Sequence, residues 1–180
     1  MKARRWEDFP LARSLRVVIR KSIMMLEDFI EDFSSAVFID LGCGDGFVLE
    51  EVSPYFGRCA GVECNLELAH AARMRLKNVA IFFGDMIKID LKSVIEEVAP
   101  PNGPSAVVFY AYLTTKLLEK MLPRMIEFAE AIGKPVYLVS TNHPLNKGSL
   151  GEKVTLLTNK TVKASPCDPG CWNVFIYKIG

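Results

Sequence analysis

The spacing of hydrophobic positions changes along the chain, and each spacing predicts a different element. Over residues 11–32 the apolar positions recur at steps of three and four, which is typical of a helix with one buried face. Residues 36–41 form a short, almost uninterrupted apolar run, as expected of a strand buried on both sides. Further strands are predicted at 58–62, 79–83, 106–111, 136–140, 153–157 and 172–179, and further helices at 65–76, 91–98 and 115–131.

Polar and glycine residues mark the ends of these elements. Asn65 stands at an expected helix N-cap, and Gly133 follows the last turn of the long helix. Strands and helices alternate as far as residue 140, which implies a parallel sheet covered by helices on both faces. The last two strands have no long helix between them, so the sheet is expected to finish with an antiparallel hairpin. The predicted fold class is α/β, with an N-terminal helix before the sheet.

Length and charge favour one globular domain. The 180 residues suit a single domain, with an N-terminal helical segment over 1–35 and a core over 36–180. The formal net charge of +1 gives no global reason to expect nucleic acid or membrane as partner. No run approaches the roughly 18 apolar residues that span a bilayer, and no apolar signal segment follows the basic N-terminus. A cytoplasmic protein without a membrane partner is expected.

The five cysteines do not form a recognisable metal motif. Cys43, Cys59 and Cys64 lie in or beside predicted strands and are interpreted as buried, small apolar residues. Cys167 and Cys171 frame a turn, where a local disulfide is an open alternative. A metal site would need more ligands than the two histidines of the chain offer, so no metal is expected.

The strongest motif is the glycine loop Asp40-Leu41-Gly42-Cys43-Gly44-Asp45-Gly46, which lies where a strand turns into a helix. Glycines let the backbone turn sharply and approach a ligand closely. The spacing differs from the G-x-G-x-x-G of dinucleotide sites. Asp40 precedes the glycines, where a carboxylate disfavours a pyrophosphate and favours an amino group. S-adenosyl-L-methionine carries an amino-acid end, a sulfonium and a ribose, and no phosphate.

Two further acidic residues follow the next two strands. Glu63, with Cys64 after it, ends the second strand, where a carboxylate can accept hydrogen bonds from both ribose hydroxyls. Asp85 follows the third strand and could accept a hydrogen bond from the adenine amino group, with Met86 packing near the ring. Each residue alone is weak evidence, but three successive strand ends together indicate an S-adenosyl-L-methionine site.

These residues resemble the first three cofactor motifs of the seven-strand S-adenosylmethionine-dependent methyltransferases, over roughly residues 36–180. The resemblance implies a doubly wound, mostly parallel seven-stranded sheet with a reversed seventh strand. Including Tyr110 after the fourth strand, the expected cofactor-binding residues are Asp40, Gly42, Cys43, Gly44, Asp45, Gly46, Glu63, Cys64, Asp85, Met86 and Tyr110.

A narrower resemblance rests on the compact layout and on the run from Tyr110 to Lys116. In these features the chain is similar to the small archaeal protein-lysine methyltransferases. That group usually has a Tyr/Pro-rich stretch before its first helix, whereas this chain has only Trp6 to Leu11 there. The resemblance implies a protein lysine as methyl acceptor.

The residues after the fourth strand are the candidates for catalysis. Methyl transfer requires a nucleophile placed in line, and a lysine amine must first lose its proton, which an apolar or aromatic channel favours. Tyr110 and Tyr112 could line such a channel, with Thr114 in a hydrogen-bonding role. Strand alternation predicts that both tyrosines point the same way. RNA, a small molecule, or no acceptor at all in a protein that only binds the cofactor remain alternatives.

Two other features have a functional and a structural interpretation. His143 follows the fifth strand and could act as a base, although a loop-packing role is favoured. Arg13, Arg16 and Arg20 form a basic face on the first helix that could attract an acidic protein or RNA. A solvated helix face is the favoured interpretation of these arginines.

Overall fold

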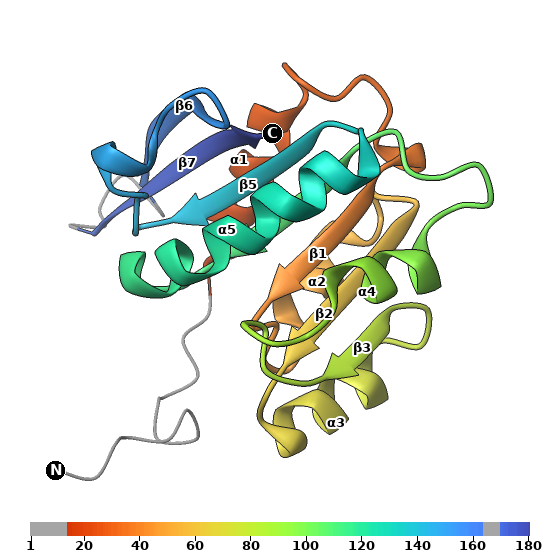
Figure 1. Cartoon of the computed structure of the whole chain (residues 1–180). Coiled ribbons are helices and arrows are strands. Elements are labelled where there is room, and N and C mark those ends of the chain that lie inside the picture. The colour runs from red at the N-terminus through yellow and green to blue at the C-terminus, as the bar shows by residue number, and fades with distance from the viewer. Residues whose placement is uncertain (1–13, 164–169) are drawn as a thin grey trace, which may run out of the picture.

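A twisted sheet runs through the molecule in the computed structural model, which describes residues 14–163 and 170–180 (Figure 1). The strands lie in the order β3-β2-β1-β4-β5-β7-β6. β7 is antiparallel to both of its neighbours, and the other strands run parallel to one another. The strands are β1 (Val37–Leu41), β2 (Arg58–Glu63), β3 (Ala80–Phe83), β4 (Val107–Ala111), β5 (Val136–Thr141), β6 (Val154–Lys163) and β7 (Cys171–Ile179).

Helices cover both faces of this sheet and create two separate hydrophobic cores. One face packs against α1 (Arg16–Leu26), α2 (Phe47–Val52) and α3 (Leu66–Arg75). The other packs against α4 (Leu91–Val98) and α5 (Thr115–Ile132). Two 3₁₀ turns, η2 (Phe33–Ser35) and η3 (Lys147–Ser149), lie in connections. Central strands such as β1 and β4 are buried along their whole length, which explains their uninterrupted apolar sequence.

The expected fold class agrees with this architecture, and both predicted helix boundaries are confirmed. The Asn65 side chain accepts hydrogen bonds from the backbone N–H groups of Glu67 and Leu68. Gly133 ends α5 in the left-handed conformation, with φ of 58°.

Two elements differ in length from the prediction. The first helix ends at Leu26 instead of continuing to residue 32, because the chain turns there and the Tyr137 hydroxyl donates a hydrogen bond to the carbonyl of Phe29. Phe29 still packs against the core, so the apolar stripe outlasts the helix. Residues 11–13 of the predicted helix lie outside the described residues. β6 runs to Lys163, well beyond the predicted end at residue 157, because it pairs with β7 as far as Cys171.

The strand order places a ligand-binding position between β1 and β4. Successive strands are added on one side of β1 as far as β3, after which the chain crosses over to β4 on its other side. In open α/β sheets, ligands bind beyond the carboxyl ends of the strands at such a switch point. The glycine loop follows β1 at this position.

Candidate functional site

The loop between β1 and α2 has the sharply turned backbone that its glycines permit. Gly42 has φ of 81° and Gly46, the N-cap of α2, has φ of 83°, a region that residues with a side chain rarely adopt. The backbone N–H groups of Gly42 and Cys43 both donate to the carbonyl of Val62 in β2. The loop is therefore fixed against the neighbouring strand.

Asp40 is a buried carboxylate without a hydrogen bond from any residue that the structure describes. It lies beside Tyr110 of β4 in the register of the sheet. Burial, and to a smaller extent the charge of Glu63, raise the pKa of the Asp40 carboxyl to about 8. An unpartnered acid in such a place is costly for a fold, which makes it a functional-site candidate.

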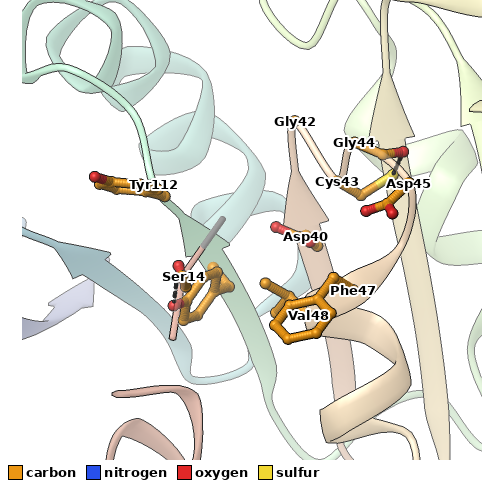
Figure 2. Close-up of a pocket in the computed structure, with 10 residues that line it drawn as sticks. Ser14, Asp40, Gly42, Cys43, Gly44, Asp45, Phe47, Val48 and Tyr112 are labelled. Carbon is orange, nitrogen blue, oxygen red and sulfur yellow. Dashed lines mark hydrogen bonds between the residues drawn. The ribbon is translucent and has the colours of Figure 1, made fainter. Parts of the chain in front are cut away.

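A cavity opens over Asp40 and is bounded by the loop on one side and β4 on the other. In Figure 2 Asp40 lies between Ser14 and the loop residues Cys43 and Asp45. The lining consists of Ser14, Asp40, Gly42, Cys43, Gly44, Asp45, Phe47, Val48, Tyr110 and Tyr112. The structure thus brings together the predicted loop residues other than Gly46 and both predicted tyrosines. Because both tyrosines line the same cavity, they point the same way, as alternation predicts.

Glu63 is tied to the backbone on both of its carboxylate oxygens. Oε2 accepts a hydrogen bond of 2.8 Å from the N–H of Gly44, and Oε1 accepts one of 2.8 Å from the N–H of Asn65. Each oxygen keeps a second lone pair for a ligand. Glu63 therefore stabilises the glycine loop through the hydrogen bond to Gly44 and also lies next to that loop.

Of the three predicted acidic residues at strand ends, only Asp40 lines the cavity, and Glu63 and Asp85 lie outside its lining. Asp85 is half-buried and accepts a hydrogen bond from the N–H of Ile87, with Lys88 Nζ 3.8 Å from its other oxygen. Met86 is close to the loop, since a Cβ on Gly42 would come within 3.4 Å of its terminal methyl. The guanidinium of Arg124 on α5 donates to the backbone carbonyls of Met86, Ile87 and Ile89 and so fixes this segment.

Two predicted cofactor residues, Gly46 and Cys64, also do not line the cavity. Gly46 sets the start of α2, and a Cβ there would come within 2.7 Å of Leu76. Cys64 is half-buried, whereas Cys43 and Cys59 are buried as predicted. The interpretation of Cys64 as buried is therefore wrong, because this residue lies just beyond the carboxyl end of β2.

The two tyrosines have different surroundings. Tyr110 is 1% exposed and its hydroxyl donates a hydrogen bond of 2.8 Å to Ser14 Oγ. Burial raises the pKa of this hydroxyl, so it stays a protonated donor. Tyr112 is half-buried and forms an aromatic cluster with Trp172 and His143, at ring-centroid distances of 5.1 and 6.1 Å.

Thr114 and His143, the two remaining candidates from the sequence, lie at the N-cap of α5 and against Tyr112. Thr114 is exposed at the N-cap of α5, makes no capping hydrogen bond with its side chain, and does not line the cavity. His143 stacks on Tyr112 at an interplanar angle of 26°. This contact agrees with the packing role favoured for His143 from sequence.

Several site residues have no clear signal in the sequence. Ser14 comes to the cavity from the chain directly before α1, and Trp172 reaches Tyr112 from the last strand. Phe47 and Val48 directly follow the glycine loop, and this adjacency alone could have indicated them.

The described arginines on the basic face of α1 are exposed, as favoured from the sequence, but they are not without partners, and the Arg16 guanidinium also lies over the ring of Phe47, 5.2 Å from its centroid. Arg16 and Arg20 form ion pairs with Glu51 of α2 at 2.7 and 3.2 Å. Arg13 lies outside the described residues, as does Cys167, so the proposed disulfide partner of Cys171 cannot be placed. Over residues 14–163 and 170–180, no group of three or more His, Cys, Asp or Glu side chains could hold a metal ion. Over the same residues, no helix is long and apolar enough to span a membrane.

Comparison with known proteins gives the same fold and no close relative. The sequence matches no family model and no curated protein. An RNA methyltransferase from Salinibacter ruber, in complex with S-adenosyl-L-homocysteine, has a TM-score of 0.62 at 18% identity, over 93% of this chain and 94% of that protein. The N-methyltransferase NodS from Bradyrhizobium japonicum WM9 has a TM-score of 0.59 at 11% identity, over 89% and 94% of the two chains.

A third similar structure is the magnesium protoporphyrin IX methyltransferase ChlM from Synechocystis PCC 6803 with bound SAM. It has a TM-score of 0.64 at 8% identity, over 92% of this chain and 79% of that protein. At these identities the likeness concerns the fold. The chain has a Rossmann-like methyltransferase fold, with the seven-stranded mixed sheet expected from the sequence.

Proposed function

We propose that this protein is an S-adenosyl-L-methionine-dependent methyltransferase. The observation that carries the proposal is Asp40, a buried carboxylate without a described hydrogen-bond donor, facing a cavity beside the glycine loop. Such a group needs a cationic or hydrogen-bonding ligand. The ammonium of the cofactor's amino-acid end fits this requirement, and a pyrophosphate does not. The three structures with this fold that are cited above are methyltransferases by name, which supports the same cofactor class.

The other candidate residues fit the remaining parts of this cofactor. Glu63 has lone pairs available for ribose hydroxyls, and Asp85 and Met86 follow the carboxyl end of β3, the strand next to β2. When bound, the cofactor supplies a methyl group that its sulfonium has already activated. The protein then has to bind it, orient the acceptor and exclude water.

We propose a protein lysine amine as the preferred acceptor. Its support is the aromatic cluster of Tyr112, Trp172 and His143 at the carboxyl end of β4. An aromatic, partly dehydrated surface lowers the pKa of a lysine ammonium and so favours the neutral nucleophile. Tyr112 lines both this cluster and the cavity over Asp40, so in this proposal it is the residue that touches the acceptor. Thr114 is exposed at the N-cap of α5 and does not line the cavity, so it has no direct role in this proposal.

Titration calorimetry with S-adenosyl-L-methionine over a pH series tests the cofactor assignment. Asp40 must ionise to pair with an ammonium, so affinity is expected to rise with pH up to about pH 8 and then to fall, because the α-ammonium of the cofactor itself loses its proton near that pH. Asp40→Asn should remove most of this dependence and weaken binding by about 2 kcal/mol at pH 8. Asp90→Asn, at an exposed helix cap far along the chain, is the matched control. Equal binding by Asp40→Asn and the wild type would contradict the site.

RNA is the second candidate acceptor, because aromatic rings such as Tyr112 and Trp172 can also stack on a base. The Salinibacter ruber structure with this fold is an RNA methyltransferase. Radiolabelled S-adenosyl-L-methionine offered with protein lysate and with RNA separates the two. Nuclease-resistant label on lysine supports the preferred acceptor, and nuclease-sensitive label supports RNA. Tight cofactor binding without any label would favour a protein that binds the cofactor and transfers nothing.

A further inference from the structure

A groove of about 440 Å³ lies between α1 and the end of β6, away from the glycine loop. Its lining consists of Val17, Lys21, Met24, Met25, Asp28, Lys160, Thr161, Val162 and Lys163. We call it the α1–β6 groove. Its apolar part includes Met24, which is 53% exposed although it is a large hydrophobic residue. Flexible methionine side chains are frequent on surfaces that accommodate varied apolar ligands.

Lysines dominate the charge of this groove. Lys21, Lys160 and Lys163 are all exposed, and none forms an ion pair with a residue in the described part of the chain. By contrast, Arg16 and Arg20, on the same helix as Lys21, are already paired with Glu51. Asp28 is the one acidic residue of the lining. Among the residues that the structure describes, the groove therefore offers net positive charge that no ion pair neutralises.

The groove leads to the aromatic cluster at the proposed acceptor site. Val162 of the groove lies directly opposite Trp172 in the β6–β7 register. The Trp172 ring in turn contacts Tyr112, with ring centroids 5.1 Å apart. The groove and the aromatic cluster are thus linked by the Val162–Trp172 strand pair and the Trp172–Tyr112 ring contact. Val162 of the groove and Trp172 of the cluster both belong to the hydrophobic core on the face of the sheet that α1 covers.

We propose that the α1–β6 groove binds an acidic segment, with apolar anchor residues, of the protein that is methylated. This inference rests on the proposed methyltransferase function and names its partner. An apolar floor with lysines around it complements a peptide that has both carboxylates and leucine-like side chains. RNA fits less well, because the groove contains Asp28 and no arginine or aromatic ring, and the chain has a pI of only about 7.6.

Fluorescence anisotropy with the full chain tests this proposal without any turnover. The probe is a labelled peptide of about twelve residues, rich in Asp and Glu, with spaced leucines and one lysine. A peptide with its acidic residues replaced by Lys, and a uridine homopolymer of the same length, are the comparison ligands. The variants are Lys160→Glu with Lys163→Glu, and separately Lys21→Glu on the other wall. Lys178→Glu is the matched control, since Lys178 is exposed on the same hairpin but does not line the groove.

The acidic peptide is expected to bind, and each groove variant should weaken its affinity by about tenfold or more, increasingly at low salt. Lys178→Glu should bind as the wild type does. Equal binding by all variants, or RNA binding that depends on the same lysines, would overturn the proposal. Calorimetry with S-adenosyl-L-methionine on the same variants separates the two claims. If cofactor binding is retained and peptide binding is insensitive, the groove assignment alone fails, whereas absent cofactor binding in the wild type removes the proposed function.

Discussion

The Glu63 carboxylate at the end of β2 accepts a 2.8 Å hydrogen bond from the backbone N–H of Gly44 in the loop after β1. Gly44 is buried, so this N–H has no ready access to water in place of the carboxylate. The residue expected to recognise the ribose thus also holds the loop that surrounds Asp40. In the proposed cofactor site, ligand binding and loop stability are therefore coupled through one side chain.

Glu63→Ala is expected to lower the free energy of unfolding by about 1–3 kcal/mol, because it leaves the buried Gly44 N–H without its acceptor. Cofactor affinity should fall as well. Glu63→Gln keeps one carbonyl oxygen as acceptor, so its free energy of unfolding and its cofactor affinity should fall less than those of Glu63→Ala. Urea unfolding measures the effect, with Glu97→Ala on the exposed side of α4 as control. A Glu63→Ala protein as stable as this control would contradict the structural role of Glu63.

Asp40→Asn is expected to stabilise the ligand-free protein while it weakens ligand binding. The folded-state pKa of Asp40, about 8, lies above the ordinary aspartate value of 3.8, so the folded protein holds a proton that the unfolded chain releases. The contribution of Asp40 to stability is therefore greatest below about pH 4 and is lost as pH rises towards about 8. Asparagine does not ionise and avoids this loss.

Thermal unfolding at several pH values measures this difference between Asp40→Asn and the wild type. The free energy of unfolding of Asp40→Asn should exceed that of the wild type by an amount that increases from about pH 5 to about pH 8. This difference should amount to a few kcal/mol at the upper end. If this difference in the free energy of unfolding decreased with rising pH, Asp40 would not be a buried, unpaired acid.

Gly61→Ala should displace the glycine loop, because the added Cβ would clash with Cys43 of that loop. A Cβ at Gly61 would lie 2.6 Å from Cys43 Sγ and 2.7 Å from Leu49 Cδ1, both closer than packed atoms allow. The expected loss of stability is about 1–3 kcal/mol, together with weaker cofactor binding, because Cys43 must move. Gly151→Ala is the control, since a Cβ there meets nothing within 4 Å. Denaturant unfolding and calorimetry of both variants provide the measurements.

Tyr110→Phe should destabilise the protein by about 1 kcal/mol by removing the hydrogen bond to Ser14. Ser14 is 2% exposed, so its hydroxyl would lose a partner in a place that water reaches poorly. Adding Ser14→Ala to Tyr110→Phe should cost less than the sum of the two single effects. Strictly additive losses in a double-mutant cycle would mean that the two hydroxyls do not interact in solution.

Much of the fold was predictable because each element has its own local pattern. The alternation of apolar runs with helical stripes follows from burial of strands on both faces and of helices on one, and this held for β1 to β5 and for α3 to α5. Where a partner decides the boundary, the prediction was wrong. β6 is extended by its pairing with β7, and α1 is cut short by the contact of Phe29 with Tyr137.

The sequence by itself determined the glycine loop, the three acids at strand ends and the kind of ligand that they suit, because these residues lie next to their strands in the chain. Only the tertiary structure decided that Asp40 is buried without a hydrogen bond from any described residue, that Glu63 accepts a hydrogen bond from Gly44, and that Trp172 contacts Tyr112. Such contacts join residues of different strands, and their distances depend on register and packing across the sheet. Local periodicity carries no information about either, so burial, the pKa of Asp40 and the aromatic cluster emerge only when the chain is folded.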